Sequence, residues 1–178
     1  MRKLIESTFM SLDGAIDSPQ NWSPPYWDDE HHAYSSRLLD GADALVLGRR
    51  TYEGFAEAWP QRSGDPFTDK LNAIPKHVAT RTLTELTWNA QPLQGDAAEA
   101  VAELKRQEGA NLLKYGTGPL SKTLLENGLL DELHVWIFPV LVGEGQRLID
   151  GIAVTHLDLV ESTRFESGIV VNAYEPKR

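Results

Sequence analysis

Short apolar runs along the chain predict a series of β-strands. Residues 3–10 are rich in Ile, Thr and Phe and are ended by turn residues at 11–14, which is typical of a first strand. The uninterrupted run Ala44–Leu47, ended by Gly48, favours a strand that is covered on both faces. Further strands are expected at 76–80, 111–115 and 133–141, and an antiparallel hairpin is expected at 157–164 and 169–174.

Apolar residues at helical spacing predict helices between these strands. The first has Tyr34, Leu38 and Leu39 on its buried side and Gly41 after its end. Because helices and strands alternate over the first two thirds of the chain, the pattern predicts a single α/β domain over residues 1–178. Its sheet is expected to be mixed and mostly parallel, with helices on both faces and the C-terminal hairpin at an edge. The helices are expected at 28–39, 51–58, 96–107 and directly after Gly118.

Composition and charge exclude several classes of function. The chain has 17 Lys and Arg against 26 Asp and Glu, a net charge of −9, which argues against non-specific binding of nucleic acid and of anionic membranes. The absence of Cys excludes disulfides, thiolate nucleophiles and Cys-ligated metals. No apolar run approaches the roughly 20 residues that span a bilayer, so we expect a cytoplasmic protein.

Adjacent arginines follow the buried run that ends at Gly48, where a strand meets the start of a helix. Guanidinium groups, a hydroxyl and free backbone N–H groups at such a junction favour binding of an anion such as phosphate. A third arginine follows another predicted strand, and parallel strands bring their carboxyl ends to one edge of a sheet. The alternative is that these arginines are separate surface residues. The candidate residues are Gly48, Arg49, Arg50, Thr51, Thr80 and Arg81.

The segment Gly116-Thr117-Gly118 is a second strand-to-helix junction. Its glycines allow the backbone to approach a pyrophosphate, and the following helix directs the positive end of its dipole toward it. The three-glycine dinucleotide fingerprint is absent, because Ser121 stands where its third glycine would be. A simple helix start is therefore the alternative interpretation.

The acidic segment at residues 28–32 ends in two histidines and resembles a metal site at first sight. The histidines are neighbours in sequence and point in different directions on a helix, so we predict no metal there and expect the carboxylates to complement the helix dipole. Trp22 and Trp27 lie in the preceding Pro-rich loop. They are expected either to cover a flat heterocyclic ligand or to pack on the core.

Six motifs in order resemble the dihydrofolate reductase-like superfamily. In particular, the chain resembles the C-terminal reductase domain of the bifunctional riboflavin-biosynthesis deaminase–reductase and its stand-alone relatives, over nearly its whole length. The resemblance implies a three-layer α/β/α fold, NADPH as hydride donor and a homodimer. The motifs are Ser11–Gly14, Leu47–Glu53, Thr80–Leu83, Tyr115–Leu120, Gly128–Leu133 and Pro139–Gly145.

The same resemblance assigns roles to residues. It places the 2′-phosphate of NADPH on Arg49, Arg50, Thr51 and Arg81, and the pyrophosphate on Gly116, Thr117, Gly118 and the helix start at Pro119 and Leu120. It places the substrate between the first loop and the first helix. There, Gly14, Trp22 and Asp28 are expected to bind the substrate, and Asp13, Asp29 and Glu30 are the candidate catalytic carboxylates.

The expected activity is hydride transfer from NADPH to a C=N or C=O bond of a small heterocycle of the pterin or pyrimidine type. Two alternatives stay open at this point. One is the riboflavin-pathway reduction of a 5-amino-6-(ribosylamino)uracil. The other is a non-catalytic protein that keeps the fold and binds a nucleotide or other ligand.

Overall fold

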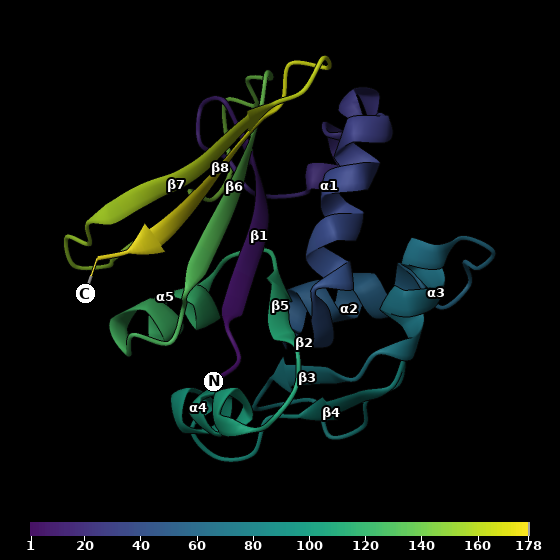
Figure 1. The fold of residues 1–178 in the computed structure, drawn as a ribbon, viewed down its shortest axis with the longest axis vertical. Coiled ribbons are helices and arrows are strands. Elements are labelled where there is room, and N and C mark those ends of the chain that lie inside the picture. The colour runs from purple at the N-terminus through teal and green to yellow at the C-terminus, as the bar shows by residue number, and fades with distance from the viewer. Residues whose placement is uncertain (178) are drawn as a thin grey trace.

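The computed structural model describes residues 1–177, whose strands form one eight-stranded sheet (Figure 1). Arg178, the last residue of the predicted domain, lies outside the described residues. The strand order is β4-β3-β2-β5-β1-β6-β8-β7. The strands are β1 (Leu4–Ser11), β2 (Ala42–Gly48), β3 (Lys76–Ala79), β4 (Ala90–Pro92), β5 (Asn111–Tyr115), β6 (Glu132–Phe138), β7 (Leu157–Arg164) and β8 (Val170–Pro176).

Five α-helices connect the strands of the described chain. Capping supports the predicted starts of the helices near residues 28 and 96: Asp28 Oδ1 accepts a hydrogen bond from the His31 amide (2.8 Å), and Asp96 Oδ1 accepts from the Ala98 amide (2.9 Å). Two short 3₁₀ turns, Pro19–Asn21 and Pro24–Tyr26, interrupt the loop after β1. The helices are α1 (Asp29–Asp40), α2 (Arg49–Ala58), α3 (Pro66–Ala73), α4 (Ala97–Arg106) and α5 (Pro119–Glu126).

The pairing of the strands confirms the predicted mixed sheet. Every neighbouring pair from β4 to β6 is parallel, whereas β8 runs antiparallel to both β6 and β7. The hairpin of β7 and β8 therefore ends the sheet at one edge, as its turn at residues 165–169 predicts. The carboxyl ends of β3, β2, β5, β1 and β6 consequently lie in a row along one edge of the sheet.

Helices cover both faces, which confirms the predicted three-layer α/β/α arrangement (Figure 1). Strand β2 shows why its sequence is uninterruptedly apolar. Leu45 and Leu47 belong to the core beneath α1, α2 and α3, whereas Ala44 and Val46 belong to the core beneath α4 and α5. None of these four side chains is more than 2% exposed.

Three details differ from the sequence prediction. Helix α3 was not predicted, although Asp65 caps it through the Thr68 amide (3.0 Å) and Pro66 occupies its first turn. Strand β4 has only three residues, too few for a periodic pattern. Strand β6 ends at Phe138 rather than at residue 141, because Pro139 has no N–H with which to continue the ladder.

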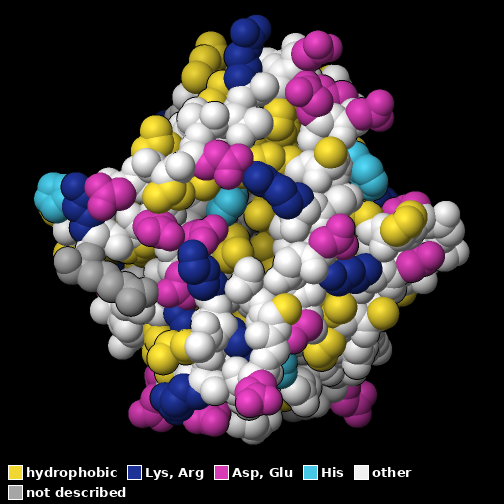
Figure 2. Space-filling model, viewed as in Figure 1, with side chains coloured by type: hydrophobic (Ala, Val, Ile, Leu, Met, Phe, Trp, Pro, Cys, Tyr) yellow, Lys and Arg dark blue, Asp and Glu magenta, His cyan; other side chains and the backbone are white. Residues whose placement is uncertain are grey.

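Within residues 1–177, no helix is long enough and apolar enough to cross a membrane. The view in Figure 2 shows acidic and basic side chains interspersed over one face of the molecule, around a central hollow where hydrophobic side chains are exposed.

Candidate functional site

The structure brings the predicted anion-binding segments together at the carboxyl ends of adjacent strands. Strand β2 lies between β3 and β5 and runs parallel to both. The segments that follow these strands, at residues 48–51, 80–83 and 116–118, therefore emerge side by side. In open α/β sheets, ligands bind in the crevice at this edge, where the order of the strands reverses.

A close contact joins the first and third of these segments. Gly116 has φ = +69°, and a Cβ atom added to it would lie 2.9 Å from Thr51 Oγ1. Glycine is therefore required there both by the backbone conformation and by the neighbouring hydroxyl. By contrast, a Cβ atom on Gly48 or Gly118 would meet nothing within 4 Å, so the backbone at both helix starts borders open space.

Arg49 links the start of α2 to the segment after β3. Its Nη1 donates to Thr82 Oγ1 (2.9 Å), and its Nε lies 3.5 Å from Glu53 Oε1, one turn further along α2. Thr80 Oγ1 accepts from the Leu83 amide (3.1 Å) and shapes the same segment. Arg50 and Arg81 are exposed and make no ion pair with any other residue from 1 to 177, so both guanidinium groups are available to an anion.

A buried charged network supports the Gly116–Gly118 loop from below. Lys114 Nζ lies 3.1 Å from Glu6 Oε2, and it donates to Ser121 Oγ (2.8 Å) and to the Gly116 carbonyl. Ser121 Oγ in turn donates to Glu6 Oε1 (3.0 Å) and accepts from the Gly118 amide (3.2 Å). The sequence analysis did not predict this network. It could have been suspected because one charged residue stands within each of two otherwise buried strands, Glu6 in β1 and Lys114 in β5.

The segment that follows β6 packs over this loop. Thr117 Oγ1 donates to the Leu148 carbonyl (3.1 Å), so the predicted pyrophosphate segment contacts the chain just beyond the Pro139–Gly145 motif. Pro119 begins α5, and Leu120 packs at the edge of the core beneath α4 and α5. Gly118 is the N-cap of α5, so this segment is a helix start. A helix start can also bind an anion, because its backbone N–H groups are free.

Asp13 holds the segment after β6 against the end of β1. Its carboxylate accepts hydrogen bonds from the Ser11 hydroxyl (2.6 Å) and from the amides of Val142 (3.1 Å) and Gly143 (2.7 Å), and the Arg147 guanidinium donates to its carbonyl. These bonds, the one from Ser11 foremost, hold the pKa of Asp13 well below its usual range. A carboxylate that stays ionised is a poor proton donor, so the contacts of Asp13 favour a positioning role.

The neighbouring Gly14 has φ = +88°, and a Cβ atom there would lie 3.3 Å from Arg147 Nη1.

Of the three acids at the start of α1, Asp28 is used as the helix cap, and its hydrogen bond from the His31 amide lowers its pKa. Glu30 Oε2 accepts from the Glu166 amide (2.6 Å). Asp29 is exposed and has no partner among the described residues, so its carboxylate is the least constrained of the three.

An aromatic cluster lies between the loop after β1, α1 and the end of β6. Trp22 packs edge-on against Phe138 (5.4 Å between ring centroids), and this contact supports the prediction of packing on the core. Trp27 is different, because it is 50% exposed and stacks on His31 (5.3 Å, interplanar angle 20°). Burial lowers the pKa of His31 to about 4, so its ring is neutral at physiological pH.

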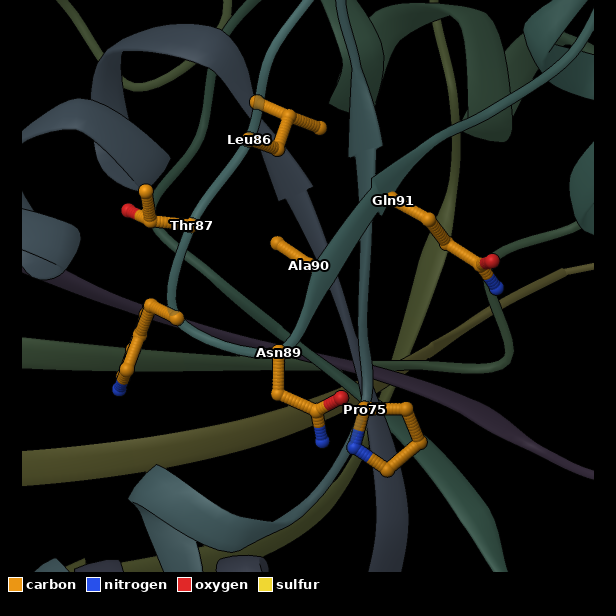
Figure 3. Close-up of a pocket in the computed structure, with 7 residues that line it drawn as sticks. Pro75, Leu86, Thr87, Asn89, Ala90 and Gln91 are labelled. Carbon is orange, nitrogen blue, oxygen red and sulfur yellow. The ribbon is translucent and has the colours of Figure 1, made fainter.

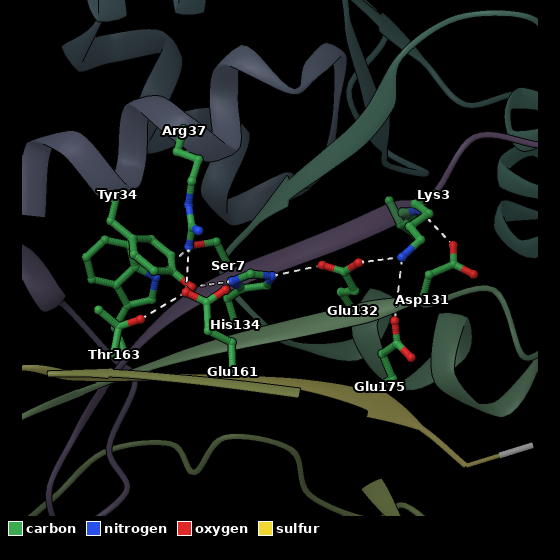
Figure 4. Close-up of polar contacts among 12 residues, drawn as sticks. Lys3, Ser7, Tyr34, Arg37, Asp131, Glu132, His134, Glu161, Thr163 and Glu175 are labelled. Carbon is green, nitrogen blue, oxygen red and sulfur yellow. Dashed lines mark hydrogen bonds and ion pairs between the residues drawn. The ribbon is translucent and has the colours of Figure 1, made fainter. Parts of the chain in front are cut away.

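A chain of hydrogen bonds beneath α1 joins it to β6 and to the N-terminus (Figure 4). Tyr34, buried in α1, donates its hydroxyl proton to His134 Nδ1 (2.8 Å), while His134 Nε2 donates to Glu132 Oε2 (3.1 Å). Lys3 Nζ donates to the other oxygen of Glu132 (2.7 Å). These bonds lower the pKa of Glu132 to about 2, and burial raises the pKa of Tyr34 to about 12. The network fixes α1, whose first turn carries the candidate acids.

A pocket of about 260 Å³ lies away from this edge (Figure 3). It is lined by Pro75 and by residues 86–91, which include the segments that lead into the amino ends of β3 and β4. None of the predicted site residues borders it. Among residues 1–177, no group of three or more His, Asp and Glu side chains is placed to hold a metal ion.

Comparisons with known proteins agree with this geometry. Residues 2–171 match the model of the RibD C-terminal domain family. Two Bacillus subtilis (strain 168) proteins described as uncharacterized are similar in sequence. YyaP is 28% identical over 97% of this chain and 94% of its own length, and YwjB is 25% identical over 81% and 80%.

Solved structures share the fold at lower identity. A crystal structure from Shewanella sp. PV-4, whose description places it provisionally in riboflavin biosynthesis, superposes with a TM-score of 0.75 at 23% identity over 99% of both chains. A pyrimidine reductase-like protein from Corynebacterium diphtheriae gives a TM-score of 0.65 at 16% identity over 99% of this chain and 92% of its own. The Thermotoga maritima deaminase/5-amino-6-(5-phosphoribosylamino)uracil reductase gives 0.69 at 15% identity, over 99% of this chain and 57% of that one.

The family match covers nearly the whole chain, including all three segments at the carboxyl edge of the sheet. The mixed sheet with its C-terminal antiparallel hairpin is common to this chain and to the RibD structures that superpose on it. This chain therefore belongs to the RibD C-terminal domain family.

Proposed function

We propose that the protein is an NADPH-dependent reductase of a small heterocyclic substrate. The observation that carries this proposal is the contact between Thr51 and Gly116, which joins an arginine-bearing helix start to a glycine loop. The two segments together offer what a phosphorylated dinucleotide needs: exposed guanidinium groups for a phosphate monoester, and backbone open to space at Gly48 and Gly118 for a pyrophosphate.

When bound, NADPH supplies a hydride from its nicotinamide ring. The residues of the chain bind and orient. Arg50 and Arg81 would hold the 2′-phosphate, with Arg49 fixed beside them by Thr82. The amides at the start of α5 would hold the pyrophosphate, while the Lys114 network keeps the loop in position by binding the Gly116 carbonyl.

A reduced C=N or C=O bond also needs a proton. Asp13 and Asp28 are committed to hydrogen bonds that favour their ionised forms, so the proposal gives the proton to the remaining acids of α1. Asp29 is the better candidate of the two, because one carboxylate oxygen of Glu30 already accepts from the Glu166 amide. An Asp29→Asn variant that keeps full turnover would remove this assignment.

The first experiment is a side-by-side titration of the protein with NADPH and NADH, read by quenching of its five tryptophans. Charge-assisted hydrogen bonds contribute about 1.5–3 kcal/mol each, or roughly 10- to 150-fold in affinity. The double variant Arg49→Ala/Arg50→Ala should therefore lose NADPH affinity by at least tenfold and keep its affinity for NADH. Arg106→Ala, an exposed arginine of α4, is the matched control. Equal losses for both cofactors would refute the phosphate site.

A second candidate is the uracil reductase step that the Thermotoga maritima name describes, and the family match favours it. Growth of a riboflavin auxotroph that lacks this reductase, with and without the gene for this chain, separates the two candidates. Binding of NADPH with no oxidation in the presence of pterins, pyrimidines, quinones or aldehydes would instead favour a non-catalytic binding protein.

We also propose that the protein forms a homodimer. Strand β7 is the outer strand of the sheet, and Leu159 and Val160 within it are 57% and 52% exposed. An exposed apolar edge strand favours association with a second chain. Light scattering at micromolar concentration should give twice the 19.8 kDa mass of one chain. A monomer would refute this proposal.

A further inference from the structure

We propose that the substrate is an uncharged planar heteroaromatic ring that carries no phosphate, held through the imidazole of His31. This inference rests on the proposed reductase function and specifies its substrate class. Three independent features of the carboxyl edge support it: the aromatic surroundings of His31, two buried polar atoms that have no hydrogen-bond partner, and the distribution of charge along the edge.

The aromatic surroundings favour a flat ligand. The His31 ring lies between Phe9 (5.6 Å between centroids), Trp136 (5.1 Å) and the half-exposed Trp27, on which it stacks. Phe9 also contacts Phe138 (4.9 Å) at the carboxyl end of β6. Ring faces of this kind favour stacking with another planar π-system. Trp27 is exposed enough to provide such a face to a ligand that enters from solvent.

Four polar atoms around this region are buried without a hydrogen-bond partner in the described structure, two of them on the serines Ser23 and Ser167 and two on ring side chains. The ring atoms are His31 Nε2 in the first turn of α1 and the hydroxyl of Tyr115, the last residue of β5, whose ring contacts Phe55 of α2 (5.5 Å between centroids). Tyr115 pairs with Ser7 of β1, and Ser7 Oγ accepts from Trp136 Nε1 (3.0 Å), so Tyr115 and Trp136 lie on the same face of the sheet. Buried polar groups in native proteins are nearly always satisfied, which makes both atoms candidates for hydrogen bonds to a ligand.

Both groups are neutral at physiological pH. Burial lowers the pKa of His31 to about 4 and raises the pKa of Tyr115 well above its usual range. A neutral imidazole nitrogen and a phenol hydroxyl suit the amide-like and amine-like edge of a heteroaromatic ring. They offer no counter-charge to an anionic group.

Charge is divided along the edge of the sheet. The arginines lie at the ends of β2 and β3, whereas the segments around the ends of β1 and β6 are acidic. Segments 11–30, 139–151 and 164–168 together contain eight Asp and Glu against two basic residues, Arg147 and Arg164. The Arg147 guanidinium donates to the Asp13 carbonyl, which holds it at the end of β1.

These segments surround one region, because hydrogen bonds join them. The Tyr26 hydroxyl donates to the Pro139 carbonyl (3.0 Å), the Gln146 amide donates to Asp17, and the Glu166 amide donates to Glu30. A phosphate dianion there would meet more carboxylates than guanidinium groups, and like charges in close proximity repel. The substrate end of the edge is therefore unsuited to a phosphoribosyl group, whereas the cofactor end is suited to phosphate.

The test compares two ligands that differ only in phosphate: 5-amino-6-(ribosylamino)uracil and its 5′-phosphate. Each is titrated into the protein, free and saturated with NADP⁺, with tryptophan fluorescence as the readout. We expect the unphosphorylated compound to bind at least tenfold more tightly. The ratio should shrink as salt is raised from 0.05 to about 0.5 M, because repulsion between exposed charges is screened.

Variants that keep the ring and remove the polar atom test the role of His31. His31→Phe and Tyr115→Phe should each weaken binding of the unphosphorylated compound by about tenfold, the value of one lost hydrogen bond. Because neither atom has a partner within the described chain, the thermal midpoint should stay equal or rise. A purely structural role would instead lower the midpoint in both variants.

The outcomes separate this inference from the proposed function. Tighter or equal binding of the phosphorylated compound overturns the inference while leaving NADPH dependence intact. Binding of NADP⁺ with no binding of either uracil compound also overturns it. Failure of NADPH and NADP⁺ to bind refutes the proposed cofactor, and the titration of the free protein then decides the ring preference by itself.

Discussion

Replacing Gly116 with alanine is expected to separate the two halves of the cofactor site. Gly116 has φ = +69°, and an L-residue in this left-handed region costs roughly 1–2 kcal/mol relative to glycine. The new methyl group would also lie 2.9 Å from Thr51 Oγ1, closer than van der Waals contact allows. Forcing that contact apart costs about 1–3 kcal/mol more. The free energy of unfolding should therefore fall by about 2–5 kcal/mol.

Gly128 provides the matched control. It has nearly the same conformation, φ = +64°, and an added Cβ atom would meet nothing within 4 Å. Gly128→Ala should therefore lose only the backbone contribution of roughly 1–2 kcal/mol. The difference between the two variants isolates the steric contact with Thr51.

Urea unfolding followed by tryptophan fluorescence measures both variants, and an NADPH titration follows for each. Gly116→Ala should weaken NADPH binding, whereas Gly128→Ala should not. Adding Thr51→Ala to Gly116→Ala removes the obstructing hydroxyl and should recover the steric part of the lost stability. Equal destabilisation by the two single variants, or no recovery in the double variant, would refute the contact between the helix start and the glycine loop.

Three further predictions concern stability. Burial without a carboxylate partner lowers the pKa of Lys76 from 10.5 to about 8. Between these two pH values the unfolded chain binds more protons than the folded one, so the free energy of unfolding should rise with pH by at most about 3 kcal/mol. Urea melts at pH 8 and pH 10.5 should show this rise for the natural sequence and not for Lys76→Met. Tyr34→Phe should cost about 1–3 kcal/mol in the same assay, because it leaves buried His134 Nδ1 unpaired, and a neutral effect would contradict the network. Hydrogen bonds to the ionised Asp13 lower its pKa, so they stabilise the folded protein above pH 3.8, and this stabilisation is lost as the pH falls further. In Asp13→Asn, the free energy of unfolding should therefore decrease less steeply below pH 3.8.

Hydrophobic patterns predicted most of the fold because the long elements bury recognisable surfaces, one face in α1 and both faces in β2. Strands β5 and β7 begin and end where the sequence predicts, and Asp28 and Asp96 cap their helices. The missed elements, α3 and β4, are short, and β4 is held by pairing with β3 rather than by a local pattern. Only tertiary contacts fix an edge strand of three residues.

The sequence predicted which segments form the candidate site, but it did not predict which side chains in them touch. The sequence indicates that arginines and glycines follow strands, but it cannot show that Thr51 touches Gly116 or that Lys114 lies beside Glu6 on the neighbouring strand. His31 illustrates the limit most clearly. Its spacing from His32 argued against a metal, whereas its contact with Trp136, more than a hundred positions away, and its unpaired nitrogen depend on the tertiary structure.

Strand β1 explains how one sheet edge serves two ligands of different chemistry. Its side chains alternate between faces, so Glu6 reaches the Lys114 network beneath the glycine loop, whereas Ser7 bonds Trp136 on the opposite face. The first contact positions the backbone that would hold a pyrophosphate, and the second supports the aromatic surroundings of His31. A substitution at Glu6 should therefore disturb the cofactor end first and one at Ser7 the substrate end, so that the two halves of the reaction are separable by mutation within a single strand.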